Sequence, residues 1–392
     1  MEILSFKNFE SRVAINVSHF PVQEGVDEYY MTFYPLKPDK VDVQLGWLSR
    51  AYTETLISIG IKRQTAVFRR FFCSDLVNQW NILEKMPFSS RCATDEKCAV
   101  SWICQPPGYI AKVAFWAYHI CDKKGSLEKH YDKHTLCLTR GSLTHNWSFG
   151  VNCLNRKTPY EQTIGILERY NSLLQIKNMS LAENVIRTWF FIKDIDANYQ
   201  EFVNARRKFF ATNGLTQKTH FIASTGVGGY HIDISAKITM DAYAISGLLP
   251  EQIKFLSAPK YLSSTYMYGV TFERGTIISY RDRKHIIISG TASINHKGRI
   301  LYEGDVLQQL KRTFENIEAL LANAGASLKN MAIMIAYVRD PSDYTIVWQQ
   351  IKQNFPAVPL IIACSNICRP GWLVEVEGIS VIPNADTDLP SF

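Results

Sequence analysis

The sequence predicts an α+β protein made of three related units that together form a pseudo-trimer within one chain. First, one pattern occurs three times, at residues 47–75, 163–194 and 309–340. In each copy an amphipathic helix is followed by a short break and by a strand that ends in Asp. Second, another strand-like segment follows each copy, so helices and strands alternate throughout the chain. We therefore expect helices to pack on one face of a sheet in each unit.

The third copy shows the pattern most clearly. Its helix has an apolar stripe at helical spacing, formed by Leu310, Phe314, Ile317, Leu320 and Leu321. Gly325 is expected to end the helix in a left-handed conformation. Residues 332–338 form a continuous apolar run, which is typical of a strand that is covered on both faces.

Further elements complete this third unit. Asp340 and Pro341 should end the strand, and residues 344–353 are predicted to form a second helix. The closing strand is predicted at residues 372–381, where residues alternate around two glutamates. The equivalent closing strands are predicted at 110–120 in the first unit and at 230–240 in the second.

The unit boundaries are expected near residues 155–158 and 258–264. The chain would then consist of an N-terminal unit (1–155), a central unit (156–258) and a C-terminal unit (259–392). A length of 392 residues is consistent with two or three domains.

Composition excludes several classes of protein. The chain is 46% hydrophobic and 20% charged, which argues against a disordered or fibrous protein. No segment approaches the roughly 20 apolar residues of a membrane span, and the N-terminus lacks the pattern of a secretory signal. The formal charge of +7 comes from scattered basic residues, so we predict neither nucleic-acid nor membrane binding.

The nine cysteines suggest a reduced, cytoplasmic protein. Their number is odd and no CxxC pair occurs. His130 and His134, with Cys137 nearby, have a spacing found in metal sites, but no fourth ligand is evident. We predict no metal site.

The third copy resembles the YjgF/Rid family through its helix, its Gly-Ala break, its strand ending in Asp, and the later VEVEG segment. Members of this family are small, usually homotrimeric proteins that bind carboxylate ligands in the clefts between subunits. The family's imine deaminases carry an Arg just after a Pro on the strand before the closing one. Here Pro359 is followed by Leu360, Ile361 and Ile362, which argues against imine-deaminase activity.

Seven segments in order are similar to the chorismatases, which have a Rid-like (chorismate-mutase-like) fold. They are RTWFFIKDI (187–195), Tyr199 with FVNAR (202–206), ASTGVGG (223–229), FERG (272–275), ISGTASI (288–294), EGD (303–305) and ICRPGWLVEVEG (367–378). The N-terminal 150 residues match this family less clearly.

This resemblance implies an activity. Chorismatases remove pyruvate from chorismate without a metal or organic cofactor. The resemblance implies that Glu375 is the catalytic acid. Family members with Cys at position 368 and Gly at position 275 give 3-hydroxybenzoate, so Cys368 and Gly275 favour this product. The expected partner is the small-molecule substrate, and the chain would be a monomer with a pseudo-trimeric body or a weak homo-oligomer.

The residues themselves suit this chemistry. Cleavage of an enol ether requires a proton at the methylene carbon, and a carboxylic acid can supply it if burial raises its pKa. Glu375 lies between two valines and, on a strand, faces the same side as Glu377. Repulsion between these carboxylates would raise one pKa. The alternative is that both face solvent on an amphipathic strand.

A dicarboxylate substrate also needs guanidinium groups. Arg274, beside the flexible Gly275, and Arg206 are the best candidates, with Arg369 as a third. Surface salt bridges are the alternative for each. Aromatic residues that would either enclose the substrate ring or belong to the core are Tyr266, Tyr268 and Trp372.

Two small-residue segments, 224–229 and 289–293, are predicted to be turns that offer backbone N–H groups to an anion or have only a structural role. Arg369 beside Cys368 would lower the thiol pKa and favour the thiolate. Alternatively, Cys368 is a small buried apolar residue.

Two other functions are compatible with the sequence. One is a non-catalytic Rid-fold protein that binds a small carboxylate ligand in one cleft. The other is a ribonuclease, an activity sometimes attributed to Rid proteins.

Overall fold

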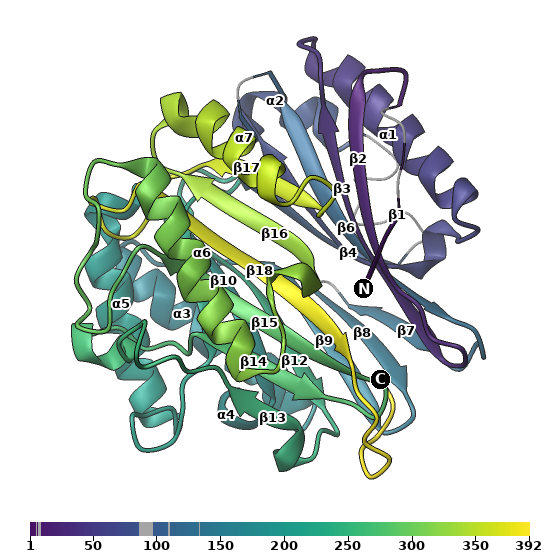
Figure 1. Cartoon of the computed structure of the whole chain (residues 1–392). Coiled ribbons are helices and arrows are strands. Elements are labelled where there is room, and N and C mark those ends of the chain that lie inside the picture. Colours follow the sequence, from purple (N-terminus) through teal and green to yellow (C-terminus); the bar gives the residue numbers. More distant parts are fainter. Residues whose placement is uncertain (5, 7–8, 86–96, 109, 133) are drawn as a thin grey trace.

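The computed structural model describes residues 1–4, 6, 9–85, 97–108, 110–132 and 134–392. In this part of the chain, three six-stranded sheets surround a shared interior, and helices cover their outer faces (Figure 1). The largest apolar cluster contains residues of all three sheets. Two further clusters fill the space between the first two sheets and their helices. The central strands of the sheets are therefore buried on both faces.

The first sheet has the strand order β1 (Glu2–Leu4), β2 (Val13–Phe20), β3 (Val26–Pro35), β6 (Val113–Asp122), β4 (Ala66–Cys73) and β5 (Ala99–Cys104). Its helices are α1 (Val41–Ser58), η1 (Arg63–Thr65) and α2 (Leu76–Leu83).

The second sheet has the order β7 (Glu128–Asp132), β8 (Thr135–Arg140), β9 (Leu143–Val151), β12 (Ile238–Ser246), β10 (Val185–Ile192) and β11 (Ala223–Gly228). Its helices are α3 (Pro159–Ile176), α4 (Leu181–Asn184) and α5 (Ile195–Thr212).

The third sheet has the order β13 (Ile253–Phe255), β14 (Gly275–Ser279), β15 (Arg283–Ala292), β18 (Val374–Pro383), β16 (Met331–Val338) and β17 (Leu360–Cys364). Its main helices are α6 (Val306–Asn323) and α7 (Tyr344–Asn354). Shorter 3₁₀ helices in this region are η2 (Pro250–Gln252), η3 (Thr265–Tyr268), η4 (Leu328–Asn330) and η5 (Pro341–Asp343).

The three sheets share one topology, which confirms the predicted fold class. If the strands of each unit are numbered along the chain, their order in every sheet is 1-2-3-6-4-5. The fourth and fifth strands are parallel in each unit, and the other neighbours are antiparallel. One helix or helix pair connects the third strand to the fourth, and another helix connects the fourth strand to the fifth.

The three units meet where their fifth strands end. Gln105 Nε2 donates a hydrogen bond to the carbonyl oxygen of Gly228 at 2.5 Å. Ser365 Oγ donates to the same oxygen at 2.6 Å. One residue from each unit thus takes part in a single junction, as a pseudo-threefold arrangement requires.

The structure confirms the secondary-structure predictions for the third unit. Gly325 has φ +76° and follows α6 in the left-handed conformation. Every residue of β16 is buried, as its uninterrupted apolar run predicted. The second helix and the closing strand occur at α7 and β18, within two residues of the predicted positions.

The first unit boundary requires correction. β7, β8 and β9 precede residue 155, but they join the second sheet because β9 pairs with β12. The sheets therefore divide the chain between β6 and β7, about thirty residues earlier than expected. The third sheet begins at β13, slightly before the predicted position 259.

The predicted closing strand at 230–240 was also placed too early. β12 begins only at Ile238. Asp233 explains the difference, because its carboxylate accepts hydrogen bonds from the backbone N–H and the hydroxyl of Ser235. These bonds stabilise a turn where alternating residues suggested a strand.

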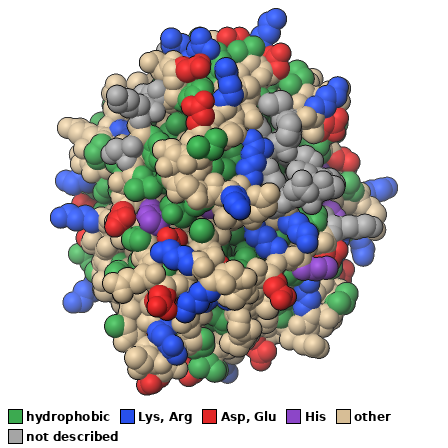
Figure 2. All heavy atoms as spheres, turned by 90° about the vertical axis from the view of Figure 1, so that its right-hand side faces the viewer, with side chains coloured by type: hydrophobic (Ala, Val, Ile, Leu, Met, Phe, Trp, Pro, Cys, Tyr) green, Lys and Arg blue, Asp and Glu red, His purple; other side chains and the backbone are tan. Residues whose placement is uncertain are grey.

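On the surface, basic and acidic side chains are interspersed across the face in Figure 2. In the described residues, no helix combines the length and apolar character needed to cross a membrane. The eight described cysteines are all free thiols. Cys92 lies outside the described residues.

Candidate active site

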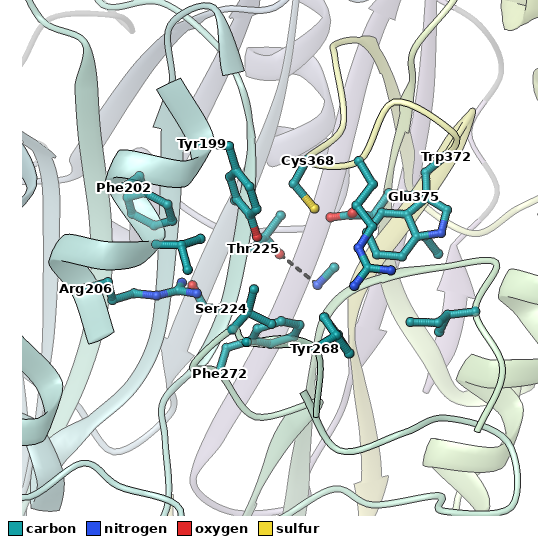
Figure 3. Close-up of a pocket in the computed structure, with 18 of the residues that line it drawn as sticks. Tyr199, Phe202, Arg206, Ser224, Thr225, Tyr268, Phe272, Cys368, Trp372 and Glu375 are labelled. Carbon is teal, nitrogen blue, oxygen red and sulfur yellow. Dashed lines mark hydrogen bonds between the residues drawn. The ribbon is translucent and has the colours of Figure 1, made fainter. Parts of the chain in front are cut away.

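A cavity of about 280 Å³ lies between the second and third units. The second unit contributes one face of α5 and the strand β11. The third unit contributes β15, the start of β18 and the two loops that precede β14 and β18. Figure 3 shows Tyr199, Cys368 and Glu375 extending toward one another from these different elements.

Glu375 is the buried acid of this cavity. It lies on β18, is 4% exposed and makes no hydrogen bond to a described residue. Burial raises the pKa of Glu375 to about 8, and the nearby charge of Glu377 contributes. The carboxyl group is therefore mainly protonated at neutral pH, and the alternative that it faces solvent is wrong.

Gly290 allows Glu375 to take this position. A Cβ atom at Gly290 would lie 2.0 Å from Oε1 of Glu375. Any larger residue at this point would displace the carboxyl group. The backbone N–H of Gly290 donates to Thr225 Oγ1 at 2.9 Å, which links this contact to β11 of the second unit (dashed line in Figure 3).

Glu377, two residues along β18, is surrounded by hydrogen-bond donors. It accepts hydrogen bonds from the Arg187 guanidinium and the Thr225 hydroxyl, from Trp189 Nε1 at 3.1 Å, and from the Tyr337 hydroxyl at 2.8 Å. Arg187 and Glu377 are both almost completely buried. Glu375 and Glu377 thus have different environments: Glu377 pairs with a guanidinium, whereas Glu375 has no such partner and burial keeps its carboxyl group protonated.

Two buried arginines give the cavity a positive charge. Arg206 donates from Nε to Thr271 Oγ1 at 3.2 Å, and Arg274 donates from Nη2 to the carbonyl oxygen of Ser263 at 3.0 Å. Nε of Arg274 is buried without a hydrogen-bond partner. Within the described residues neither guanidinium has a carboxylate at ion-pair distance, so the predicted alternative of surface salt bridges does not apply. Such groups suit an anionic ligand.

Arg369 lies at the side of the cavity, packed on aromatic rings. Its guanidinium carbon is 4.4 Å from the ring centroid of Tyr268 and 4.9 Å from that of Trp372. The Tyr268 ring is also 5.6 Å from the Arg274 guanidinium. Trp372 donates from Nε1 to the carbonyl oxygen of Ser293 at 3.1 Å. These contacts fix flat walls beside the positive groups.

The Cys368 thiol lines the cavity, but the predicted thiolate is wrong. The residue keeps some exposed area, yet the cavity walls surround its sulfur, and this burial raises its pKa to about 12. The neighbouring Glu375 contributes to the increase, which outweighs the opposite effect of Arg369. Tyr199 lines the same cavity as Cys368. Cys368 is a neutral thiol.

Several predicted site residues lie elsewhere. Tyr266 is 45% exposed and lines a separate, smaller pocket. Gly275 does not line the cavity; a Cβ there would lie 2.5 Å from the Leu256 side chain, so packing explains this glycine. The two predicted small-residue turns belong mainly to strands β11 and β15, although Ser224 and Gly290 do reach the cavity.

Some lining residues were not predicted as site residues. Tyr199 and Phe202 precede Arg206 on α5, and Phe272 precedes Arg274. The spacing of Tyr199, Phe202 and Arg206 places them on one face of a helix, so helical periodicity could have identified them. Thr225 and Gly290 carry no such signal, because their importance depends on contacts between two units.

Only one of the three units carries an acid at this position. In β18, Glu375 follows Val374, which pairs with the last residue of β16. The corresponding pairs are Val113 with Cys73 and Ile238 with Ile192. The residues equivalent to Glu375 are therefore Ala114 in the first unit and Thr239 in the second.

Fold and cavity together define an α+β protein of three like units with one acid-bearing cleft between two of them. Residues 278–382 match the family model described as Endoribonuclease L-PSP. This chain is 36% identical to a RutC family protein of Pyrococcus abyssi over 97 residues, which cover 24% of this chain and 76% of that protein. The chain therefore belongs to the RutC family, the YjgF/Rid family that its motifs resemble.

Two other similarities extend this result. The chain is 26% identical over 97 residues to 3-aminoacrylate deaminase RutC of Acinetobacter baylyi, covering 24% of this chain and 77% of that protein. A crystal structure of a chorismatase superposes with a TM-score of 0.59 and 17% identity, covering 81% of this chain and 93% of that one. This structural similarity shows that the two proteins share their fold over about four-fifths of this chain.

Proposed function

We propose that this protein removes pyruvate from chorismate and that its product is 3-hydroxybenzoate. The observation that carries the proposal is a buried, protonated Glu375 in a cavity with two arginines that lack acidic partners. The similarity of the fold to a chorismatase and the seven sequence segments support the choice of substrate.

The charges of the cavity suit a dicarboxylate. Chorismate has one carboxylate on its ring and another on its enolpyruvyl group, and Arg206 and Arg274 offer two guanidinium groups from opposite units. Tyr268, Phe272 and Trp372 supply flat surfaces for the ring. The surrounding apolar walls strengthen these electrostatic contacts by excluding water.

Glu375 would act as the general acid. Its proton is transferred to the methylene carbon of the enol ether, which becomes the methyl group of pyruvate. The adjacent ring hydroxyl oxygen attacks the ether-bearing carbon as the carbon–oxygen bond breaks, which gives an epoxide and pyruvate, and the hydroxyl proton passes to the Glu375 carboxylate. Opening of the epoxide and loss of a ring proton restore aromaticity. Pyruvate and 3-hydroxybenzoate together contain all the atoms of chorismate, so no water is consumed.

Cys368 would steer this second stage as a neutral thiol. Its sulfur lies beside Glu375, in the same cavity as Tyr199, and the thiol can pass a proton during epoxide opening. Without the thiol, water would compete for the reactive intermediate and the product would shift toward a dihydrodiol.

The test is incubation of the purified chain with chorismate, with chromatographic identification of the products. Glu375→Gln should lower pyruvate release by about 100-fold or more, the usual contribution of a general acid. Glu273→Gln is the matched control, because burial also raises the pKa of Glu273 but this residue lies outside the cavity walls. Full activity of Glu375→Gln would refute the assignment.

Cys368→Ala tests the product. We expect pyruvate release to continue while 3-hydroxybenzoate is replaced in part by the dihydrodiol. An unchanged yield of 3-hydroxybenzoate would remove the thiol from the mechanism. Binding of chorismate without any pyruvate, measured by calorimetry, would instead favour a non-catalytic carboxylate-binding protein.

A further inference from the structure

Two cysteines face each other where β4 and β5 of the first unit end. Cys73 is the last residue of β4, and Cys104 is the last residue of β5. The two strands are parallel, and their register pairs Cys73 directly with Cys104. Partnered Cα atoms on neighbouring strands lie about 4.8 Å apart, within the range of about 4.4–6.8 Å that disulfides span. The backbone spacing therefore permits a disulfide between them.

The two cysteine side chains point to the same face of the sheet. Two residues earlier in each strand, the rings of Phe71 and Trp102 stack with their centroids 4.1 Å apart. Side chains alternate between the faces along a strand, so Cys73 and Cys104 lie on the same face as these rings. Both contact the apolar cluster between the first sheet and its helices. The Cys104 thiol leans toward β4, because it donates to the carbonyl oxygen of Ser74 over 3.9 Å.

The pair combines an accessible thiol with a buried one. Cys104 retains some exposed area, whereas Cys73 is completely buried. Both are free thiols. A reagent therefore reaches Cys104 first, and Cys73 lies where its sulfur can displace the reagent afterwards. An accessible cysteine beside a second, resolving cysteine is the arrangement that reversible thiol oxidation requires.

The other two units lack this pair at the equivalent positions. In the second unit Ile192 is partnered with Gly228, and in the third unit Val338 is partnered with Cys364. The fold therefore accepts residues without sulfur at both positions. Cys364 is also a free thiol with some exposed area, but the residue opposite it is a valine. The third unit thus supplies an internal control for the pair in the first.

We propose that Cys73 and Cys104 form a reversible disulfide by exchange with a low-molecular-weight disulfide. The Cys104 thiolate attacks one sulfur of the reagent, whose sulfur–sulfur bond breaks, and the departing thiolate takes up the proton that Cys104 released. Cys73 then attacks the Cys104 sulfur of this mixed disulfide. The second half of the reagent leaves as a thiolate and takes up the proton of Cys73. Two protein thiols are thereby oxidised to one disulfide, and the reagent is reduced to two thiols.

The strand geometry makes this disulfide easy to reduce. Residues in register hold their Cβ atoms about as far apart as the strands, about 4.8 Å, whereas a disulfide prefers about 3.8 Å. Bond formation must draw the ends of β4 and β5 together, and such strain favours reduction. It would also act on a unit boundary, because the backbone of Cys104 exchanges hydrogen bonds of 3.0 and 3.3 Å with Tyr230 of the second unit. This inference does not depend on the proposed reaction, since neither cysteine lines the cavity of Glu375.

Oxidised glutathione is the probe, and it is added to the full chain at about pH 8.5, because burial raises the pKa of both thiols and only thiolates exchange. The remaining thiols are then alkylated, and the peptides are identified by mass spectrometry. In wild type we expect a peptide pair linked through Cys73 and Cys104, which disappears when excess reduced glutathione is added. Cys364 should carry at most a glutathione adduct, because Val338 faces it.

Cys73→Val is the matched variant, since valine occupies this position in the third unit. It removes the resolving thiol and leaves Cys104 in place, so the glutathione adduct on Cys104 should be at least about tenfold more abundant than in wild type. Equal amounts of this adduct in the two proteins, or the absence of the linked pair from oxidised wild type, would overturn the proposal. A linked pair that withstands excess reduced glutathione would refute its reversibility.

Discussion

Glu377→Gln is expected to change the pH range in which the protein is active. Glu377 is a buried carboxylate with four donors, and its charge helps to keep Glu375 protonated. The substitution removes that charge and leaves the guanidinium of Arg187, which favours the ionised form of Glu375. Both consequences lower the pKa of Glu375.

The size of the decrease in the pKa of Glu375 follows from the strand geometry. Residues two apart on a strand are separated by about 6.6 Å, and at an effective dielectric constant of about 20 two charges at that distance interact by about 2.5 kcal/mol. This corresponds to a pKa decrease of nearly 2 units. With a starting pKa of about 8, Glu375 would then lose its proton near pH 6.

The assay is pyruvate release from chorismate between about pH 5.5 and about pH 9.5. For wild type we expect activity to fall tenfold per pH unit above about 8, and for Glu377→Gln the same fall should begin 1 to 2 units lower. At low pH the rates of the two proteins should converge, because Glu375 is protonated in both.

Arg187→Gln provides the matched control. It breaks the same buried ion pair, at a comparable cost of about 3–5 kcal/mol in stability, but it leaves the negative charge unbalanced. The activity should therefore extend to higher pH. If folded samples of both variants show profiles that shift in the same direction, or do not shift, the electrostatic explanation is refuted.

Three further predictions concern the same cavity. Glu375→Gln should stabilise the protein relative to wild type increasingly as the pH rises from about 4.5 to about 8, because the raised pKa of Glu375 makes its ionisation destabilising. In unfolding experiments the gain in the free energy of unfolding should reach up to about 5 kcal/mol. A difference in this free energy that stays constant between about pH 5 and about pH 8.5 would contradict the prediction. Gly290→Ala should lower kcat by about tenfold or more and affect KM less, because the Cβ of the alanine displaces the Glu375 carboxyl group. A kcat equal to that of wild type would show that the position of this carboxyl group is not critical. Arg206→Lys keeps the positive charge but loses the planar guanidinium group, which can bind a carboxylate through two N–H donors. KM for chorismate should therefore rise by about tenfold in steady-state assays. An unchanged KM would exclude Arg206 from substrate binding.

Much of the fold could be predicted because its signals are local. The apolar stripe of α6, Gly325 and the buried run of β16 lie within thirty-five residues of one another, and each reports its own conformation. The position of β9 could not be predicted in this way. It pairs with β12, about ninety residues later, and nothing in its sequence identifies that partner.

In the candidate site, too, local sequence identifies some residues but not the contacts between distant segments. Glu375 and the two buried arginines could be selected because residue type and motif identify them. The charge state of Cys368 could not, since the adjacent Arg369 suggested a low pKa while enclosure by another unit raises it. Likewise, Thr225 matters only because it joins Gly290 and Glu377 across the boundary between two units.

Joining the three units in one chain has a consequence for how the clefts diverge. In a homotrimer, every substitution appears at all three interfaces at once, so a change that improves one cleft must be tolerated in the others. Here Glu375, Ala114 and Thr239 occupy equivalent positions but are encoded separately. Each interface can therefore acquire its own chemistry, and a buried acid that destabilises one of them need not be repeated in the other two.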